Sequence, residues 1–228
     1  MIVGSRCLAG AAALAVSAGA AAASAAVSPA GLVSAALAKA HAQTSVHYVS
    51  SQASSGRAVT IVGDAATDRG VQHITFRVGG RVGHVMVLVV ANTAYIRGDA
   101  FTLANYMGIP SATAAAWAGK WLSLARSAPG YPAVSAAVRL GSTLDEVKMP
   151  PPFREIGTST RHGRRVVGIV SHFTHAGRTV TATLYVDAAR SLPVEQVDRS
   201  GGITVKATFS RWNERVSVSP PASAIAIR

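Results

Sequence analysis

Seven histidines make metal binding the first chemistry to consider in this 228-residue sequence. His172 and His175 form an H-x-x-H motif, but residues three apart on a strand point to opposite faces of a sheet. They could share a metal only if His175 lay in a turn, and no carboxylate stands near them in sequence as a third ligand. We therefore expect strand and turn histidines rather than a metal site.

The residues that could act in catalysis are also poorly placed. The sequence lacks the G-x-S-x-G motif, and Ser159 and His162 share an apparent hairpin, which is a poor platform for a catalytic triad. Asp145 and Glu146 are adjacent rather than opposed, unlike the paired carboxylates of a glycosidase. The remaining acidic candidates are expected on solvated strand surfaces: Glu155, Glu195 and Asp198.

The glycine-rich stretch 79–83 does not indicate a nucleotide cofactor. A predicted strand follows it, whereas a dinucleotide-binding fingerprint opens a helix. We expect no enzyme, no cofactor and no bound metal.

The charge of the chain is its most unusual bulk property. The formal net charge is +12, but basic residues are dispersed, apart from the run 161–165, and no aromatic residues interleave with them. A surface that stacks nucleic-acid bases needs such aromatics, so we expect no nucleic-acid partner. Dispersed positive charge favours solubility and attraction to anionic surfaces, including membranes. The single cysteine excludes a disulfide framework.

The first 25 residues are typical of a secretory signal peptide. Arg6 precedes an alanine-rich apolar run, and Ala23-Ser24-Ala25 matches the small-x-small cleavage pattern. The alternative is a membrane anchor over 7–27, which is just long enough to span a bilayer but only weakly hydrophobic. We expect cleavage and a secreted or extracytoplasmic envelope location, with uncleaved anchoring as the alternative.

The remaining residues 26–228 predict one α+β domain. A helix is expected over 30–43, because Ser28 can cap it and Pro29 suits its first turn. Short strands with period-two alternation follow over 46–97 and again over 153–209, joined by tight turns such as Gly79-Gly80. Between them lies an inserted layer of about 99–149, in which helical periodicity over 99–140 predicts short helices at about 101–107, 112–118 and 132–140. About ten strands are expected in one long antiparallel sheet.

This balance of elements has a consequence for ligand binding. One helix and a few short ones offer little material to cover the apolar face of a ten-stranded sheet, so a cavity or open trough is expected. An ordinary filled core is the alternative, because alternation does not reveal volume. The residues expected to line the cavity lie on the apolar parity of their strands, or on one parity of the doubly apolar strand 81–90: Ile74, Phe76, Met86, Leu88, Leu184, Val205 and Phe209.

Four stretches of the sequence carry a family resemblance. They are 94–99 (AYIRGD), 118–123 (AGKWLS), 184–187 (LYVD) with 192–194 (LPV), and 209–214 (FSRWNE). Together the order of elements resembles the LppX/LprG-type envelope lipoproteins of actinobacteria and, through them, the LolA/LolB lipoprotein-carrier fold. The resemblance implies an unclosed β-barrel around helices, with a hydrophobic cavity for acyl chains of lipids or lipidated proteins. The chain departs from that family because Cys7 directly follows Arg6 and is not a lipobox cysteine.

The leading hypothesis is a monomeric, secreted protein of the cell envelope that binds a lipid or acyl-chain ligand without making or breaking bonds. The main alternative is a structural or interaction module with a packed core, whose basic surface docks an anionic envelope partner. A hydrolase with unrecognised residues is a third hypothesis, and no catalytic constellation supports it.

Overall fold

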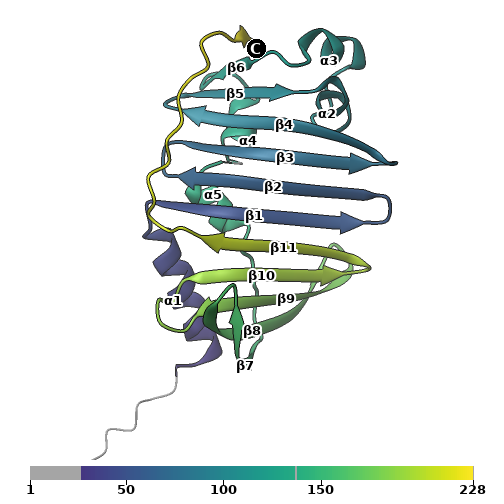
Figure 1. Cartoon of the computed structure of the whole chain (residues 1–228). Coiled ribbons are helices and arrows are strands. Elements are labelled where there is room, and N and C mark those ends of the chain that lie inside the picture. Colours follow the sequence, from purple (N-terminus) through teal and green to yellow (C-terminus); the bar gives the residue numbers. More distant parts are fainter. Residues whose placement is uncertain (1–26, 137, 228) are drawn as a thin grey trace, which may run out of the picture.

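A single curled sheet of twelve strands organises the molecule (Figure 1). The computed structural model describes residues 27–136 and 138–227. The expected signal peptide, 1–25, lies outside these residues. Within them, no helix is both long enough and apolar enough to span a membrane.

The strands fall into two groups along the chain. The first group is β1 (Ser45–Ser54), β2 (Arg57–Ala66), β3 (Gly70–Val78), β4 (Arg81–Val90), β5 (Thr93–Gly98) and β6 (Leu122–Ala125). The second group is β7 (Phe153–Arg161), β8 (Arg164–His175), β9 (Arg178–Asp187), β10 (Pro193–Ser200), β11 (Ile203–Ser210) and β12 (Ile225–Ala226).

The spatial order of the strands is β12-β6-β5-β4-β3-β2-β1-β11-β10-β9-β8-β7. All neighbours are antiparallel except β12 and β6, which pair in parallel. The two groups meet where β1 pairs with β11, with Tyr48 opposite Phe209. The end strands β12 and β7 do not pair with each other, so the barrel is unclosed. This confirms the expected α+β class with a long antiparallel sheet.

Tight turns explain why so many strands fit into so short a chain. Gly79 and Gly80 both have positive φ, at 54° and 79°, which is the conformation that a two-residue hairpin of matching twist requires. β3 and β4 are therefore joined by a tight hairpin, in which Val78 lies directly opposite Arg81. The expected hairpin at this position is confirmed.

Five helices cover one face of the sheet, which we call the helix-covered face. They are α1 (Pro29–His41), α2 (Ala100–Asn105), α3 (Ser111–Trp117), α4 (Tyr131–Ala136) and α5 (Leu140–Asp145). The Ser28 hydroxyl accepts a hydrogen bond from Gly31 N at 3.1 Å, which fixes the start of α1 as expected. α1 contacts β7, β9, β10 and α5, whereas α2 contacts β4, and α4 contacts β5.

These helices make two separate hydrophobic cores with the sheet. One core joins α1 and α5 to β8, β9 and the adjoining strands, around Ala36, Leu144 and Leu184. The other joins α2, α3 and α4 to β3–β6, around Leu103 and Val87. The sheet is continuous beneath both cores, and the space between them is covered by α4, α5 and the residues that follow α5.

A C-terminal strap, residues 211–224, runs along one edge of the sheet from the end of β11 to β12 (Figure 1, yellow). It crosses the ends of the intervening strands, and Ile225 N then donates a hydrogen bond to Trp121 O at 2.8 Å. The strap, β6, β12 and α5 were not among the elements expected from the sequence.

Candidate ligand-binding hollows

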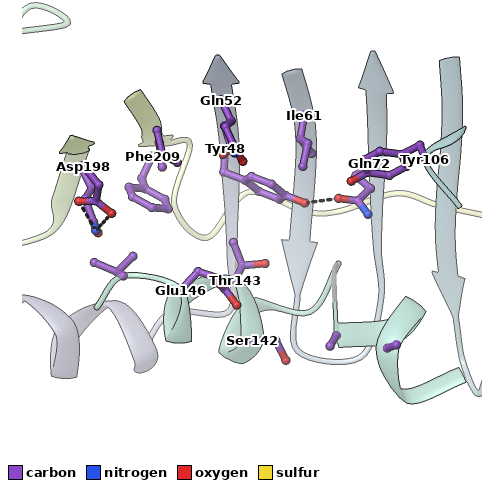
Figure 2. Close-up of a pocket in the computed structure, with 17 residues that line it drawn as sticks. Tyr48, Gln52, Ile61, Gln72, Tyr106, Ser142, Thr143, Glu146, Asp198 and Phe209 are labelled. Carbon is purple, nitrogen blue, oxygen red and sulfur yellow. Dashed lines mark hydrogen bonds between the residues drawn. The ribbon is translucent and has the colours of Figure 1, made fainter. Parts of the chain in front are cut away.

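A hollow of about 650 Å³, which we call the central hollow, lies between the two cores (Figure 2). Its floor is the helix-covered face of β1–β3, β10 and β11, and its roof is α4, α5 and the residues that follow α5. The lining mixes apolar and polar side chains: Tyr48, Ser50, Gln52, Ile61, Gln72, Tyr106, Ala133, Ala136, Ser142, Thr143, Glu146, Val147, Gln196, Asp198, Val205, Ala207 and Phe209.

Tyr48 crosses the floor of the central hollow (Figure 2). Its hydroxyl donates a hydrogen bond to Gln72 Oε1 at 3.1 Å, and both side chains are buried. Gly63 sits opposite Tyr48 in the register, and a Cβ there would lie 2.5 Å from the Tyr48 ring. Burial, followed by the charge of Asp64, raises the pKa of Tyr48, so its hydroxyl stays protonated and serves as a donor.

Gln196 and Asp198 form a second polar feature on β10. Gln196 Nε2 donates to both carboxylate oxygens of Asp198 at 2.9 Å. Burial raises the pKa of the Asp198 carboxyl, and the hydrogen bonds from Gln196 offset only part of that effect.

Two polar atoms at the central hollow have no hydrogen-bond partner within the described part of the chain. They are Gln196 Oε1 and Thr143 Oγ1, which face the hollow from β10 and α5. Buried polar atoms are nearly always hydrogen-bonded in folded proteins. The side chains of Gln196 and Thr143 line the hollow, and these two atoms are buried beside it with their hydrogen-bonding capacity unused.

A second hollow of about 940 Å³ lies beside the first, toward the β8–β9 and β10–β11 turns, and we call it the tip hollow. Its apolar lining includes Met149, Phe173, Val180 and Ile203. Asp198 and Val205 line both hollows, so the two adjoin each other. Both volumes fall within the range of about 300–1,000 Å³ that is common for small-molecule sites.

The seven residues expected to line a cavity are divided by the structure. Val205 and Phe209 line the central hollow, and Val205 also lines the tip hollow. Ile74 and Leu184 are buried in the two cores, where they pack against neighbouring side chains. Phe76 is also buried, with ring contacts to Phe101 and Tyr106 at centroid distances of 5.9 Å and 5.4 Å.

Met86 and Leu88 lie on the face of β4 away from the helices. Alternation places Val85, Val87 and Val89 in the core under α2, and these three residues are almost fully buried. Met86 pairs with Arg97 on β5 and Leu88 with Tyr95, on the opposite side of the sheet. The hollows are therefore not reached by either residue, and we leave both out of the site proposed below.

The residues that sequence reasoning missed are the polar ones at inward positions. Gln72 shares the parity of Ile74 and Phe76 on β3, and Gln196 and Asp198 share the inward parity of β10. A polar residue at a core position of an otherwise alternating strand was the available signal. Thr143 in α5 and Glu146 just after it lie outside the strands, so strand alternation could not mark them.

The residues considered above for metal binding or catalysis make other contacts. His172 Nδ1 lies 3.0 Å from Thr181 Oγ1, and His41 pairs with Asp145 at 3.8 Å. His162 Nε2 lies 2.8 Å from a carboxylate oxygen of Glu195. Within the described residues no group of three or more His, Cys, Asp or Glu side chains could hold a metal ion.

Glu195 is the most deeply buried carboxylate of this set and was expected on a solvated surface. Its side chain is only 3% exposed, because Lys206 Nζ and His162 Nε2 both lie 2.8 Å from Oε2. Burial alone would raise the pKa of Glu195, but the hydrogen bonds from Lys206 and His162 outweigh it and lower the pKa. This ion-pair cluster of Glu195, Lys206 and His162 lies on the face of β10 opposite Asp198, and its role is structural.

A curled, unclosed antiparallel sheet with helices and hollows on one face defines a half-barrel fold. The chain has this fold in common with LprF from Mycobacterium bovis, with a TM-score of 0.57 and 15% identity over 84% of this chain and 96% of that one. The lipoprotein LppX from Mycobacterium tuberculosis is also similar, with a TM-score of 0.52 and 15% identity over 82% of this chain and 96% of that one. The expected resemblance to LppX/LprG-type proteins is thus confirmed in the fold. No protein-family model matches the sequence, and no curated protein matches it either.

Proposed function

We propose that this protein is a non-enzymatic, extracytoplasmic envelope protein that binds lipids or acylated molecules in the two adjoining hollows. The observation that carries the proposal is the pair of hollows, which meet at Val205 and Asp198 on the helix-covered face of the sheet. The fold shared with a mycobacterial lipoprotein supports the envelope location.

The lining of the hollows supports an amphiphilic ligand rather than a bare hydrocarbon. Val205, Ala207 and Phe209 offer an apolar strip along β11. Transfer of an acyl chain from water onto such a surface contributes about 25 cal/mol per Å² of apolar area buried. The polar side chains of Gln196, Asp198 and Thr143 line the same space and suit the polar part of such a ligand.

The proposal is tested by filling the junction of the hollows. Val205 is half-buried and lies opposite Gln52 on β1 and Asp198 on β10. In Val205→Trp, the indole should occupy space that an acyl chain would use, and losing the burial of about two methylenes weakens binding about tenfold. We expect this loss in titrations with a fluorescent fatty acid, with an unchanged melting temperature.

Val62→Trp is the matched control, because Val62 is 38% exposed and lies on the other face of the sheet, beside Val49 and His73. It should bind the fatty acid like the parent. If the parent takes up no fatty acid and Val205→Trp melts at a markedly lower temperature, the hollow is ordinary core space and the proposal fails.

A further inference from the structure

Four hairpin turns of the sheet lie at the same edge, which we call the tip edge. They are the β1–β2, β3–β4, β8–β9 and β10–β11 turns. Because each of these strands is antiparallel to its neighbour, alternate turns must fall on the same side of the sheet. Figure 1 shows the β1–β2, β3–β4 and β10–β11 turns on the right.

Each of the four turns carries an exposed arginine: Arg57, Arg81, Arg178 and Arg199. No acidic residue occurs in the turn segments 54–57, 78–81, 175–178 and 199–203. Within the described residues, none of the four arginines forms an ion pair. The tip edge is therefore a row of uncompensated positive charges.

The opposite edge of the sheet has a different character. There some of the basic residues pair with acids, as Arg69 does with Asp68 and Arg164 with Asp187, and Arg211 makes a longer contact with Glu214. The four tips thus differ from the opposite edge because no acidic residue accompanies the arginines in their turns, although unpaired arginines occur at both edges.

Two acids near the tip edge, Asp99 and Asp198, form hydrogen bonds with neutral groups. Asp99 Oδ1 accepts a hydrogen bond from Thr102 N at 2.8 Å and thereby caps α2. Asp198 accepts hydrogen bonds from Gln196 inside the hollows. Neither lies in a turn segment, and neither forms an ion pair with one of the four arginines in the described structure.

The tip hollow opens between two of these turns. His175 and Arg178 come from the β8–β9 turn, Ser200 and Ile203 from the β10–β11 turn, and all four line the hollow. An apolar hollow whose mouth lies among unpaired cations suits the surface of a lipid bilayer, which has anionic groups outside and acyl chains within. A nucleic acid would use the cations and leave the hollow empty.

We propose that the tip edge docks on an anionic membrane surface and brings the mouth of the tip hollow to the lipid headgroups. The docking depends on the four arginines alone, whereas its use in lipid exchange rests on the proposed function.

The experiment is flotation of the full chain with vesicles of pure phosphatidylcholine and with vesicles containing phosphatidylglycerol. We expect binding only to the anionic vesicles, with release at high salt. The quadruple variant Arg57→Gln, Arg81→Gln, Arg178→Gln and Arg199→Gln should partition onto them about a thousandfold less than the parent.

A matched control loses the same charge elsewhere. Arg126, Arg165, Arg190 and Arg215 are exposed and lie toward the opposite edge, and none forms an ion pair in the described structure. Their combined change to Gln should leave most of the vesicle binding intact. An equal loss in both quadruple variants would overturn the proposal, because net charge would then explain the binding without a docking edge.

Two further outcomes separate the proposals. Val205→Trp should still dock on anionic vesicles, so a failed uptake experiment leaves the docking result standing. If the parent binds duplex DNA at physiological salt as tightly as it binds the vesicles, and the tip variant loses both equally, the edge is a general polyanion surface and the membrane proposal fails.

Discussion

Two carboxylates on β10, Asp198 and Glu195, have opposite surroundings. Asp198 faces the hollows and meets only the amide of Gln196, so burial dominates and raises its pKa. Glu195 faces the other side of the sheet, where Lys206 and His162 hold its pKa below the ordinary value. The same strand thus contains one acid that favours protonation and one that favours ionisation.

Asp198→Asn should therefore stabilise the protein at neutral pH. A raised pKa in the folded state means that the folded chain binds this proton more tightly, so stability is lost as pH rises from the ordinary Asp pKa through the raised one. The variant carries no charge there, and we expect its melting temperature at pH 7 to exceed that of the parent by a few degrees. The difference should vanish at a pH below the ordinary Asp pKa, and a difference that persists there would contradict this explanation.

Glu195→Gln should have the opposite effect. Removing the acid leaves Lys206 and His162 without their shared partner, at a cost of about 1–3 kcal/mol in the free energy of unfolding at neutral pH. Because the folded-state pKa is lowered, the contribution of Glu195 is present above the ordinary Glu pKa and is lost as pH falls through the lowered one. Urea denaturation of both proteins at several pH values should show the gap closing in acid, and a constant gap would mean that packing is responsible.

For single residues, the alternation of apolar and polar side chains along a strand predicted which of them face the helices, wherever only one face of the strand is apolar. Val205 and Phe209 were placed on the helix-covered face because Lys206 and Thr208 alternate with them. On β4 both parities are apolar, so the pattern could not show that the core takes Val87 rather than Met86. The inward amides were missed because a polar residue in a strand is usually solvated.

Among the elements, the C-terminal strap depends on one asparagine. Asn213 Oδ1 accepts hydrogen bonds from Thr44 N at 2.8 Å and Thr44 Oγ1 at 3.1 Å, and its amide group donates to Gln43 Oε1 at 2.6 Å. Its φ of 64° lies in the left-handed region, which asparagine tolerates better than most residues. These bonds hold the start of the strap against the start of β1.

Asn213→Ala should lower the free energy of unfolding by about 1–2 kcal/mol, because it removes the bonds to Thr44 and strains the left-handed backbone. Asn213→Gly also removes the bonds but relieves the strain, so its loss should be smaller. Chemical denaturation of the two variants and the parent measures both contributions. Alanine and glycine variants of equal stability would show that the backbone is not strained here, and parent-like stability of both would show that the strap is held by other contacts.

The elements that escaped prediction are the short ones. β6 has four residues and β12 has two, too few to display alternation, and β12 is defined only by its pairing with β6. α5 follows α4 after a short break, and its six residues continue a helical pattern that seemed to end at Leu140. The two strand-rich regions, predicted over 46–97 and 153–209, agree within a residue with the observed outer bounds of β1–β5 and β7–β11.

For the whole molecule, sequence reasoning could compare the amount of helix with the width of the sheet, but it could not locate the space left over. That space depends on where α1 and α5 pack relative to α2, α3 and α4. The gap between the two cores is a property of helix packing across more than a hundred residues of sequence. Alternation along single strands contains no information about it.

The pairing of β1 with β11 has a consequence for how the chain reaches this structure. Each half-sheet forms largely from neighbouring hairpins, whereas Tyr48 finds Phe209 only after a long loop has closed, which is slow. Until then each half exposes an unpaired edge strand of matching length and pattern. In such a chain the contacts that β1 makes with its own β11 are equally open to the β11 of a second molecule, which is the route to a domain-swapped dimer. The concentration of chains during folding therefore decides whether the two halves join within one molecule or between two.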